Sequence, residues 1–229
     1  MKAWCYSLVL IFFVTSTSHA QKYEDIIFGV PNFKPFTYSE NGQLKGDAII
    51  KVKEALEQVD VSYRIEQYET YTALIKALKG NDIQGFFLAT KNPERDKYAR
   101  FSKAVDYNNW AWFYPKGKGI SFKSSEFKHS AVIGTVQKTN TYRWLVRQGY
   151  QAIGEKRENL PSLLISGSLS AVFMAEKVFE DACKDQNINP DLFNKKIEQQ
   201  RDFGIYISKQ YLLNQPDFLD NLNQYIAKP

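Results

Sequence analysis

The sequence has few residues of the kinds that bind transition metals or act as catalytic nucleophiles. Among 229 residues there are two cysteines and two histidines. Beyond residue 20 these types are represented only by Cys183 and His129, which excludes zinc-ligand spacing and a Ser-His-Asp triad with a well-placed histidine. We therefore expect no metal, no cofactor and no hydrolase or zinc chemistry.

Cys183 has no cysteine to pair with once the N-terminal segment is set aside, which excludes an intramolecular disulfide. In the run VFEDACKD it follows Val178 and Phe179 at helical spacing. A buried structural thiol is therefore a better interpretation than a nucleophile.

The chain also lacks blocks of charge of one sign. Its formal net charge is +5 at pH 7, of which Lys2 contributes one, and basic and acidic residues are interspersed. Such a modest excess is typical of a solvated surface and does not indicate a nucleic-acid partner.

The sequence also lacks apolar runs long enough to span a membrane. Its longest apolar run lies near the start. Lys2 precedes the apolar core SLVLIFFVT, which is too short to span a bilayer comfortably. Ser18 and Ala20 then place small residues where signal peptidase reads them. We expect residues 1–20 to be a signal peptide, Gln21 to begin the mature chain, and the protein to be periplasmic. Cys5 precedes the apolar core, so it is not a lipid-attachment cysteine.

Strand and helix patterns alternate through the first half of the chain. Short apolar or alternating runs predict strands at 26–30, 61–66 and 83–89. Apolar residues at helical spacing predict helices at 48–56 and 71–78, and the second should begin at an N-cap, Thr70, and stop at Gly80. This β-α-β-α-β order indicates a mostly parallel sheet covered by helices.

A second α/β unit follows. We predict strands at 109–114, 131–136, 170–173 and 203–208, with a surface loop over 117–130. Helices are expected within 139–148, 159–167, 175–183 and 216–226, the last with Pro216 in its first turn. Two α/β halves without a flexible Gly/Ser linker suggest two lobes with a ligand cleft between them.

The order of motifs resembles a known family. PNFKPFTY is followed by an N-G-x-L-x-G turn, then YTALIKAL, then TKNPERDKYARFS. This order is similar to that of type II periplasmic solute-binding proteins, and more narrowly to the polar amino-acid-binding group, solute-binding family 3. That group includes glutamine- and histidine-binding proteins. The resemblance runs over 26–226, and T-x-x-P-E-R followed by F-S is its most specific part.

The resemblance implies an α/β fold of two lobes, each a mostly parallel sheet flanked by helices. We place the first part of lobe 1 at 21–107, lobe 2 at 108–206 and a return segment of lobe 1 at 207–229. The ligand would lie between the lobes.

The resemblance also implies which residues bind the ligand's carboxylate. In the family, a hydroxyl and a guanidinium at the positions of Thr90 and Arg95 hold that group. An arginine suits this role because its planar fork donates two parallel, charge-assisted hydrogen bonds. The alternative is a surface loop in which Arg95 pairs with Glu94 or Asp96.

Apolar contacts to the ligand are implied at three further positions. Phe33 and Tyr71 match the two aromatics that enclose the ligand's body, and Leu88 lies in the strand that leads to Thr90. The alternative for Tyr71 is a core role, because it shares the apolar face of its helix.

The second lobe offers the turn QKTNT at 137–141. In the family, backbone N–H groups of this strand-to-helix turn meet the ligand's carboxylate, which here implicates Thr139, Asn140 and Thr141. Lys138 stands where glycine is common. Simple capping of the helix by Thr or Asn is the alternative and is compatible with binding.

The acidic residues that hold the ligand's amine in the family are largely absent from this sequence. The aspartate expected after the VFM strand is Ala175, with Glu176 beside it, and an acidic position in the first lobe is Val30. Glu176 is included as a ligand-binding candidate, since a one-residue shift of the strand end would let it replace the aspartate. Its alternative is an ordinary acid in the first turn of a helix.

These observations predict a monomeric binding protein that closes on a small carboxylate-bearing solute and performs no chemistry. Its closed form would be read by a membrane ABC permease or by a sensor. Two alternatives stay open. One is an enzyme that dehydrates cyclic acids with Glu176 as its acid, and the other is an envelope protein without a small ligand, acting through its 116–129 loop.

Overall fold

The computed structural model describes residues 23–117 and 119–227. The signal peptide expected at residues 1–20 and its cleavage site lie outside these residues. Within them, no helix has the length and apolar character needed to cross a membrane.

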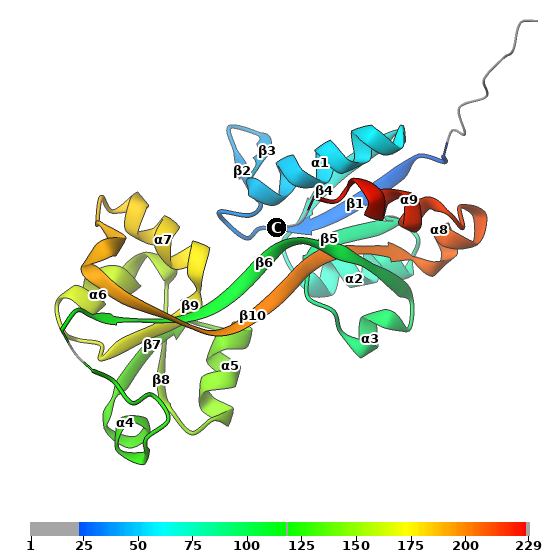
Figure 1. Cartoon of the computed structure of the whole chain (residues 1–229). Coiled ribbons are helices and arrows are strands. Elements are labelled where there is room, and N and C mark those ends of the chain that lie inside the picture. The colour runs from blue at the N-terminus through cyan, green and yellow to red at the C-terminus, as the bar shows by residue number, and fades with distance from the viewer. Residues whose placement is uncertain (1–22, 118, 228–229) are drawn as a thin grey trace, which may run out of the picture.

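One eight-stranded sheet runs through the molecule in the order β4-β1-β5-β10-β6-β9-β7-β8 (Figure 1). At one end, β1 (Ile26–Pro31) lies between and parallel to β4 (Tyr63–Tyr68) and β5 (Gly85–Ala89). The crossovers are α1 (Asp47–Val59) and α2 (Tyr71–Lys79). A small hairpin of β2 (Tyr38–Glu40) and β3 (Gln43–Lys45) precedes α1. These elements confirm the predicted β-α-β-α-β unit, and we call them the first lobe.

The second lobe repeats this arrangement at the other end of the sheet. In it, β7 (Val132–Val136) lies between and parallel to β8 (Gln151–Glu155) and β9 (Ala171–Ala175). Its helices are α4 (Ser125–Ser130), α5 (Asn140–Arg147), α6 (Leu160–Ile165) and α7 (Glu176–Asp185). The two-lobed α/β fold expected from the sequence is confirmed.

Two long antiparallel strands join the lobes. They are β6 (Ala99–Pro115) and β10 (Phe193–Ser208), and Figure 1 shows them crossing together from one lobe to the other. In the first lobe β10 pairs with β5, and in the second β6 pairs with β9. Because both strands continue without a break, the lobe boundaries at 107/108 and 206/207 remain a proposal.

The chain ends on the first lobe. After β10 come α8 (Lys209–Asn214) and α9 (Phe218–Tyr225), and α9 packs on α1. Pro216 was expected in the first turn of the last helix, but it lies two residues before that helix. Asp217 occupies the N-cap position instead.

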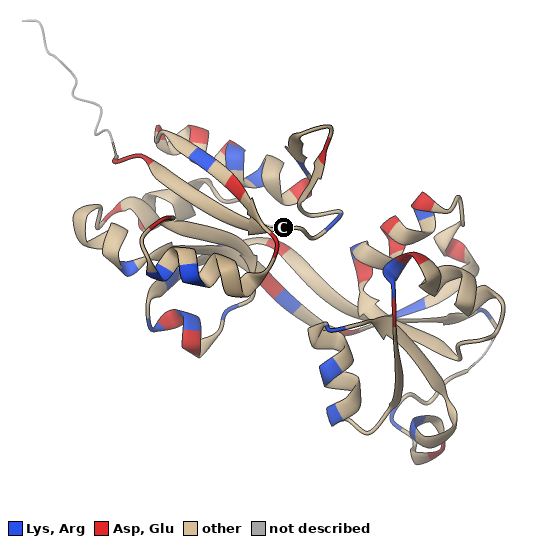
Figure 2. Cartoon of the chain, turned by 180° about the vertical axis from the view of Figure 1, so that it is seen from behind, with Lys and Arg blue, Asp and Glu red and all other residues tan. Residues whose placement is uncertain are grey.

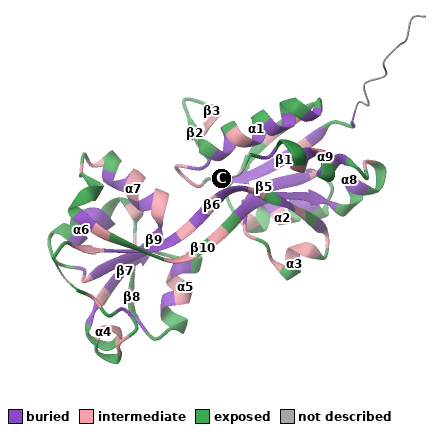
Figure 3. Cartoon of the chain, viewed as in Figure 1, coloured by how far each residue is buried: buried purple, intermediate pink, exposed green. Residues whose placement is uncertain are grey.

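Apolar side chains are buried in both lobes, as the buried segments in Figure 3 show, and one apolar cluster includes residues of both. In the first lobe the inner face of α1 is buried, with Val52 and Leu56 fully covered. In the second, Trp112 stacks on Phe122 with ring centroids 4.6 Å apart and lies 4.6 Å from the ring of Phe173. Buried aromatic rings of this size contribute much of the stability of a small lobe.

Local predictions are mostly confirmed. The Thr70 hydroxyl caps α2 by accepting from the Ala73 N–H at 3.1 Å, and the helix ends at Gly80. Cys183 is fully buried, and burial raises the pKa of its thiol to about 11. Basic and acidic residues are interspersed over the elements seen in Figure 2, as expected.

Three segments differ from the sequence-based expectation. The loop expected over 117–130 ends in α4, which Ser124 caps by accepting from the Phe127 N–H. The strands predicted at 109–114 and 203–208 both begin ten residues earlier, at Ala99 and Phe193. The first part of β10 lacks apolar alternation because much of it is exposed, so periodicity does not reveal it.

Candidate ligand-binding cleft

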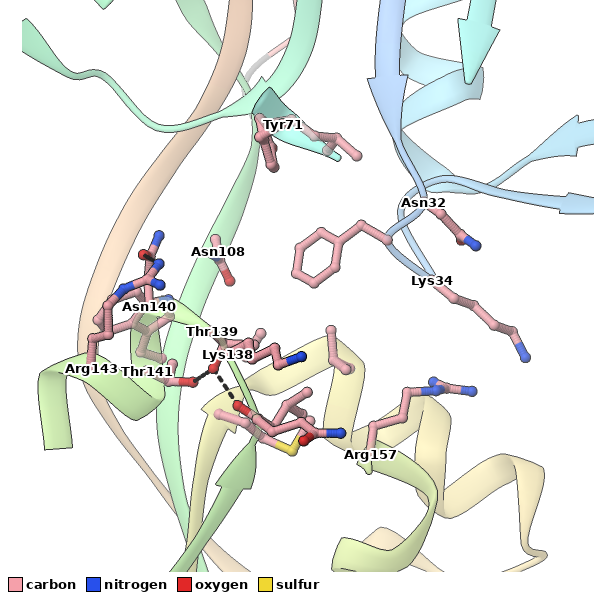
Figure 4. Close-up of a pocket in the computed structure, with 18 of the residues that line it drawn as sticks. Asn32, Lys34, Tyr71, Asn108, Lys138, Thr139, Asn140, Thr141, Arg143 and Arg157 are labelled. Atoms are coloured by element: carbon pink, nitrogen blue, oxygen red, sulfur yellow. Dashed lines mark hydrogen bonds between the residues drawn. The ribbon is translucent and has the colours of Figure 1, made fainter. Parts of the chain in front are cut away.

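A cleft of about 720 Å³ lies between the lobes and is lined by residues of both. Figure 4 shows Asn32, Lys34 and Tyr71 on the first-lobe side, with Thr139, Asn140 and Arg157 on the second-lobe side. Of the nine predicted site residues, eight line this cleft: Phe33, Tyr71, Leu88, Thr90, Arg95, Thr139, Asn140 and Thr141. Its volume suits a small organic solute.

Arg95 reaches the cleft from a single helical turn, α3 (Pro93–Asp96), which the sequence suggested only as a turn. Asn92 caps it by accepting from the Glu94 N–H at 2.8 Å. The hydroxyl of Tyr206 on β10 accepts from the Asn92 N–H at 2.8 Å and donates to the Asp96 carboxylate at 2.9 Å. The turn is therefore attached to the sheet at both ends.

The guanidinium of Arg95 is oriented by neutral groups. Its Nη1 donates to the backbone carbonyl of Thr90 at 2.9 Å, and its Cζ lies 5.3 Å from the ring centroid of Tyr71. Across the described residues no carboxylate pairs with it. Glu94 instead pairs with Lys97, so the alternative of a surface ion pair with Glu94 or Asp96 is not found.

Tyr71 supports this wall of the cleft from α2. Its hydroxyl donates to the backbone carbonyl of Leu88, and burial raises the pKa of Tyr71 to about 12. Leu88 itself has a φ of +61°, in the left-handed region that a leucine rarely adopts. Strain of this kind persists where surrounding contacts enforce it, and it is common at binding sites.

Phe33 forms the neighbouring wall from the loop after β1. Its ring stacks on Phe36 with centroids 5.4 Å apart and meets the edge of Phe203 at 6.1 Å. This loop is anchored where α1 begins, because the Phe36 carbonyl accepts from the Ala48 N–H at 3.2 Å. Gly46 has a φ of +126°, and a Cβ there would lie 2.1 Å from the Phe36 oxygen, so only glycine permits this approach.

The N-terminus of α5 forms the second-lobe wall. Thr139 is the N-cap residue and accepts from the Tyr142 N–H at 3.3 Å. Its hydroxyl also lies 2.8 Å from that of Thr141, which lies 2.9 Å from that of Thr135. Lys138 has a φ of +61°, the conformation that favours glycine, so the turn keeps its shape although glycine is replaced. Capping by Thr139 is thus found, and ligand contact by this turn remains a prediction.

Glu176 is the one predicted site residue that the structure does not bring into the cleft. Its carboxylate accepts from Asn109 Nδ2 at 2.7 Å and pairs with Lys195. Burial alone would raise the pKa of Glu176, but the hydrogen bonds from Lys195 and Asn109 lower it below its ordinary value. Ala175 does line the cleft, and Val30 is buried, so neither expected acidic position supplies a carboxylate. The described residues contain no His, Cys, Asp and Glu cluster that could hold a metal.

Sequence reasoning missed four cleft residues on the strands that join the lobes, namely Asn108, Trp110, Arg201 and Phe203. Asn108 and Arg201 both line the cleft and lie opposite each other in the β6–β10 register. Asn108 directly precedes the predicted strand NWAWFY, and Arg201 follows the polar run KKIEQQ. Apolar periodicity did not reveal the strands that carry Asn108 and Arg201, because both strands are polar where they cross between the lobes.

The cleft is also bridged by an ion-pair network at one side. Lys34 of the first lobe lies 2.9 Å from a carboxylate oxygen of Asp185 on α7 and 3.6 Å from Asp181. Arg157 donates to the same two carboxylates from the second lobe. We call these four residues the rim network.

Comparison with known proteins agrees with this geometry. The family model of the bacterial extracellular solute-binding proteins, family 3, matches residues 26–228. No curated protein sequence matches the chain.

Solved structures with the same fold include several from bacteria. The L-cystine solute receptor of Neisseria gonorrhoeae, unliganded and open, has a TM-score of 0.67 at 15% identity, covering 89% of this chain and 85% of that one. A histidine kinase sensor domain similar to periplasmic binding proteins has a TM-score of 0.67 at 12% identity, covering 89% and 93%. The GluR0 ligand-binding core from Nostoc punctiforme, in complex with L-glutamate, has a TM-score of 0.64 at 16% identity, covering 88% and 91%.

At these identities the likeness to solved structures shows the fold alone. The family model is the stronger finding, because it spans nearly all of the described residues. It agrees with the motif order, the two-lobed sheet and the cleft between the lobes. The chain belongs to the bacterial extracellular solute-binding proteins, family 3.

Proposed function

We propose that this protein is a periplasmic binding protein that closes on a small carboxylate-bearing solute and performs no chemistry. The observation that carries the proposal is Arg95. Its guanidinium lines the interlobe cleft, is oriented by the Thr90 carbonyl and the Tyr71 ring, and has no carboxylate partner in the described part of the chain. A partly buried cation with free donors in a cleft is suited to bind an anion.

The remaining walls fit the rest of such a ligand. Phe33 and Tyr71 offer aromatic surface to its body, and the N-terminus of α5 offers backbone N–H groups from the second lobe. A ligand that touches both lobes stabilises the closed arrangement, because only that arrangement allows all the contacts at once. The closed form would then be recognised by a membrane ABC permease or by a sensor, with the binding protein acting as a monomer.

An enzymatic role on the same scaffold receives less support. Acid catalysis by Glu176 would require a carboxyl group with a raised pKa in an apolar pocket. Glu176 instead pairs with Lys195 outside the cleft lining, and its pKa is lowered. The segment 116–129 contains part of a helix, and nothing about it favours an interaction role over the cleft.

The test is a thermal-shift screen of the mature chain with amino acids, monocarboxylates, dicarboxylates and small peptides, followed by calorimetry on the best ligand. Arg95→Met removes the charged fork while keeping much of its bulk. We expect it to weaken binding by about 2–5 kcal/mol, as for truncating one member of a buried charge pair. Fold stability should change little.

Arg100→Met is the matched control, because Arg100 is exposed on β6 and does not line the cleft. It should bind like the unmodified protein. The proposal fails if no carboxylate-bearing compound binds, or if Arg95→Met binds normally but unfolds much more readily.

A further inference from the structure

Seven cationic side chains line the cleft, against the two carboxylates of Glu155 and Glu158. The cations are Lys34, Arg95, Lys138, Arg143, Lys156, Arg157 and Arg201. Lys34 and Arg157 are already neutralised in the rim network. The side chains of Lys138, Arg143 and Lys156 are exposed and therefore solvated.

This leaves Arg95 and Arg201, both only partly exposed. Neither pairs with a carboxylate within the described residues. Removing a charge from water without a counter-ion is unfavourable. A cleft with two such groups is therefore unbalanced even after one carboxylate has bound to Arg95.

Arg201 is positioned in the same manner as Arg95. Its guanidinium stacks over the ring of Trp110, with Cζ 4.2 Å from the centroid. Its Nε and Nη2 donate to the side-chain oxygen of Gln199 at 3.2 and 3.1 Å. The orientation of the fork is thus fixed by neutral neighbours, while Nη1 has no hydrogen-bond partner in the described part of the chain.

Asn108 provides an independent sign of a ligand at this place. It lies opposite Arg201 in the strand register, lines the cleft, and is 8% exposed. Its Oδ1 is buried and has no hydrogen-bond partner in the described structure. Figure 4 shows Asn108 between Tyr71 and the Thr139 turn. A buried amide without a partner costs free energy. Turning this amide by 180° exchanges Oδ1 and Nδ2, and Nδ2 can then donate a hydrogen bond to an acid group in the cleft.

Strand geometry explains why these groups gather on the cleft side. Side chains two residues apart share one face of a strand, so Asn108 and Trp110 lie together, facing Gln199 and Arg201 across the ladder. Asn109 belongs to the other face. Its Oδ1 also lacks a partner, but its Nδ2 bonds to Glu176 and it does not line the cleft.

We propose that the cleft binds a dianionic solute, with one acid group at Arg95 and Thr90 and a second at Arg201 and the Asn108 amide. The inference rests on the proposed function and narrows its substrate class. The two guanidiniums stack on different rings, Tyr71 for Arg95 and Trp110 for Arg201, which indicates two subsites.

The test compares acids that differ by one charge. Calorimetry on the mature chain uses α,ω-dicarboxylates of four to seven carbons, each paired with the monocarboxylate of equal carbon count. A carboxylate-phosphonate of the best length shows whether the second subsite takes a carboxylate or a phosphonate. We expect the best diacid to bind at least about 30-fold more tightly than its monoacid, as for one charge-paired contact.

Variants assign the difference to its subsite. Arg201→Gln should reduce diacid affinity to that of the matched monoacid, while leaving monoacid affinity within about threefold. It should also reduce the diacid-induced change in tryptophan fluorescence, since Arg201 stacks on Trp110. Arg143→Gln is the control, because it removes an exposed cleft cation of equal charge. The diacid and monoacid affinities of this control should each stay within about threefold of those of the unmodified protein.

The outcomes separate this inference from the proposed function. If mono- and diacids bind equally, or if Arg201→Gln weakens both alike, there is no second acid subsite, although carboxylate binding stands. If Arg143→Gln weakens the diacid as much as Arg201→Gln does, the preference comes from the general field of the cleft and the subsite is rejected. If no acid binds, or if Arg95→Met binds the acids as well as the unmodified protein does, both proposals are rejected.

Discussion

Lys34 and Asp185 form an ion pair at 2.9 Å between the first lobe and α7 of the second, although 151 residues separate them in the chain. Arg157 donates to the same carboxylate. The hydrogen bond from Lys34 is the main cause that lowers the pKa of Asp185 below its ordinary value. The rim network therefore links the lobes without any ligand, and it should favour closure.

Removing this link should open the unliganded protein. Lys34→Met leaves Asp185 paired only within its own lobe, so we expect a larger radius of gyration by small-angle X-ray scattering. Because the pair is partly exposed, its contribution is at most about 1 kcal/mol. In the unmodified protein, raising the salt concentration should have a similar effect.

Lys45→Met is the control, since Lys45 pairs with Glu40 inside one hairpin of the first lobe. Its radius of gyration should match that of the unmodified protein. An unchanged radius in Lys34→Met would show that the rim network has no influence on the lobe arrangement.

The left-handed backbone of Leu88 predicts that glycine replaces it better than alanine does. Alanine usually replaces a buried residue better than glycine does, but Leu88 has a φ of +61°. Both substitutions lose the packing of Leu88 beyond its Cβ, and only Leu88→Gly relieves the backbone. We expect Leu88→Gly to be more stable than Leu88→Ala by about 1 kcal/mol in urea unfolding. If Leu88→Ala is the more stable, Leu88 is not in the left-handed region in solution.

The binding of free amino acids should be weak, because an ammonium group finds no carboxylate at Ala175 and Glu176 is occupied by Lys195. Leaving a buried cation unpaired costs several kcal/mol. L-glutamate should therefore bind at least about 100-fold more weakly than glutarate, which has the same two carboxylates without the amine.

Glu155 is the cleft carboxylate that could contradict this prediction, since it is only partly exposed and no cation pairs with it among the described residues. Calorimetry with the twenty amino acids checks it. Sub-micromolar binding of any of them, lost in Glu155→Gln or in Glu176→Gln, would show that the amine is recognised after all.

The stability of the protein should depend on pH through Asp106 of β6. Burial alone would raise the pKa of Asp106, but hydrogen bonds from Lys177, the Tyr107 N–H and Lys51 lower it. A carboxyl whose folded pKa is lowered stabilises the fold above its unfolded pKa of about 4, and that stabilisation is lost as the pH falls through the folded value.

Asp106→Asn should therefore cost about 1–3 kcal/mol in urea unfolding at pH 7 and progressively less below pH 4. Asp202→Asn, at an exposed position on β10, should cost little at either pH. A cost for Asp106→Asn that is the same at pH 7 and pH 3 would contradict this account.

Much of the fold and several cleft residues could be predicted, because apolar periodicity marks buried elements and the TKNPER motif marks a defined turn. The cleft position of Arg95 was predicted from the surrounding motif. The helical turn α3 directs its side chain back to the Thr90 carbonyl. The backbone conformation of Lys138 could not be predicted from the sequence, because lysine rarely adopts the left-handed conformation that glycine favours.

Asn108 and Arg201 could not be predicted for a different reason. They lie where the two strands cross between the lobes and where both strands are partly exposed, so their neighbours lack the alternation that reveals a strand. Glu176 was a natural candidate from its position in the sequence. Its partner Lys195, nineteen residues further on, is brought to it only by the tertiary structure.

The two strands that join the lobes also determine how the protein can move. A loop would let each lobe reorient freely, and a ligand would have to offset that lost freedom. In β6 and β10 the connection is a hydrogen-bonded ladder with register shifts at Phe203 and Gly204, and bulges of this kind increase local twist. The lobes can therefore approach each other mainly by twisting and bending one ribbon. A solute bound between the lobes would therefore have little lobe freedom to offset.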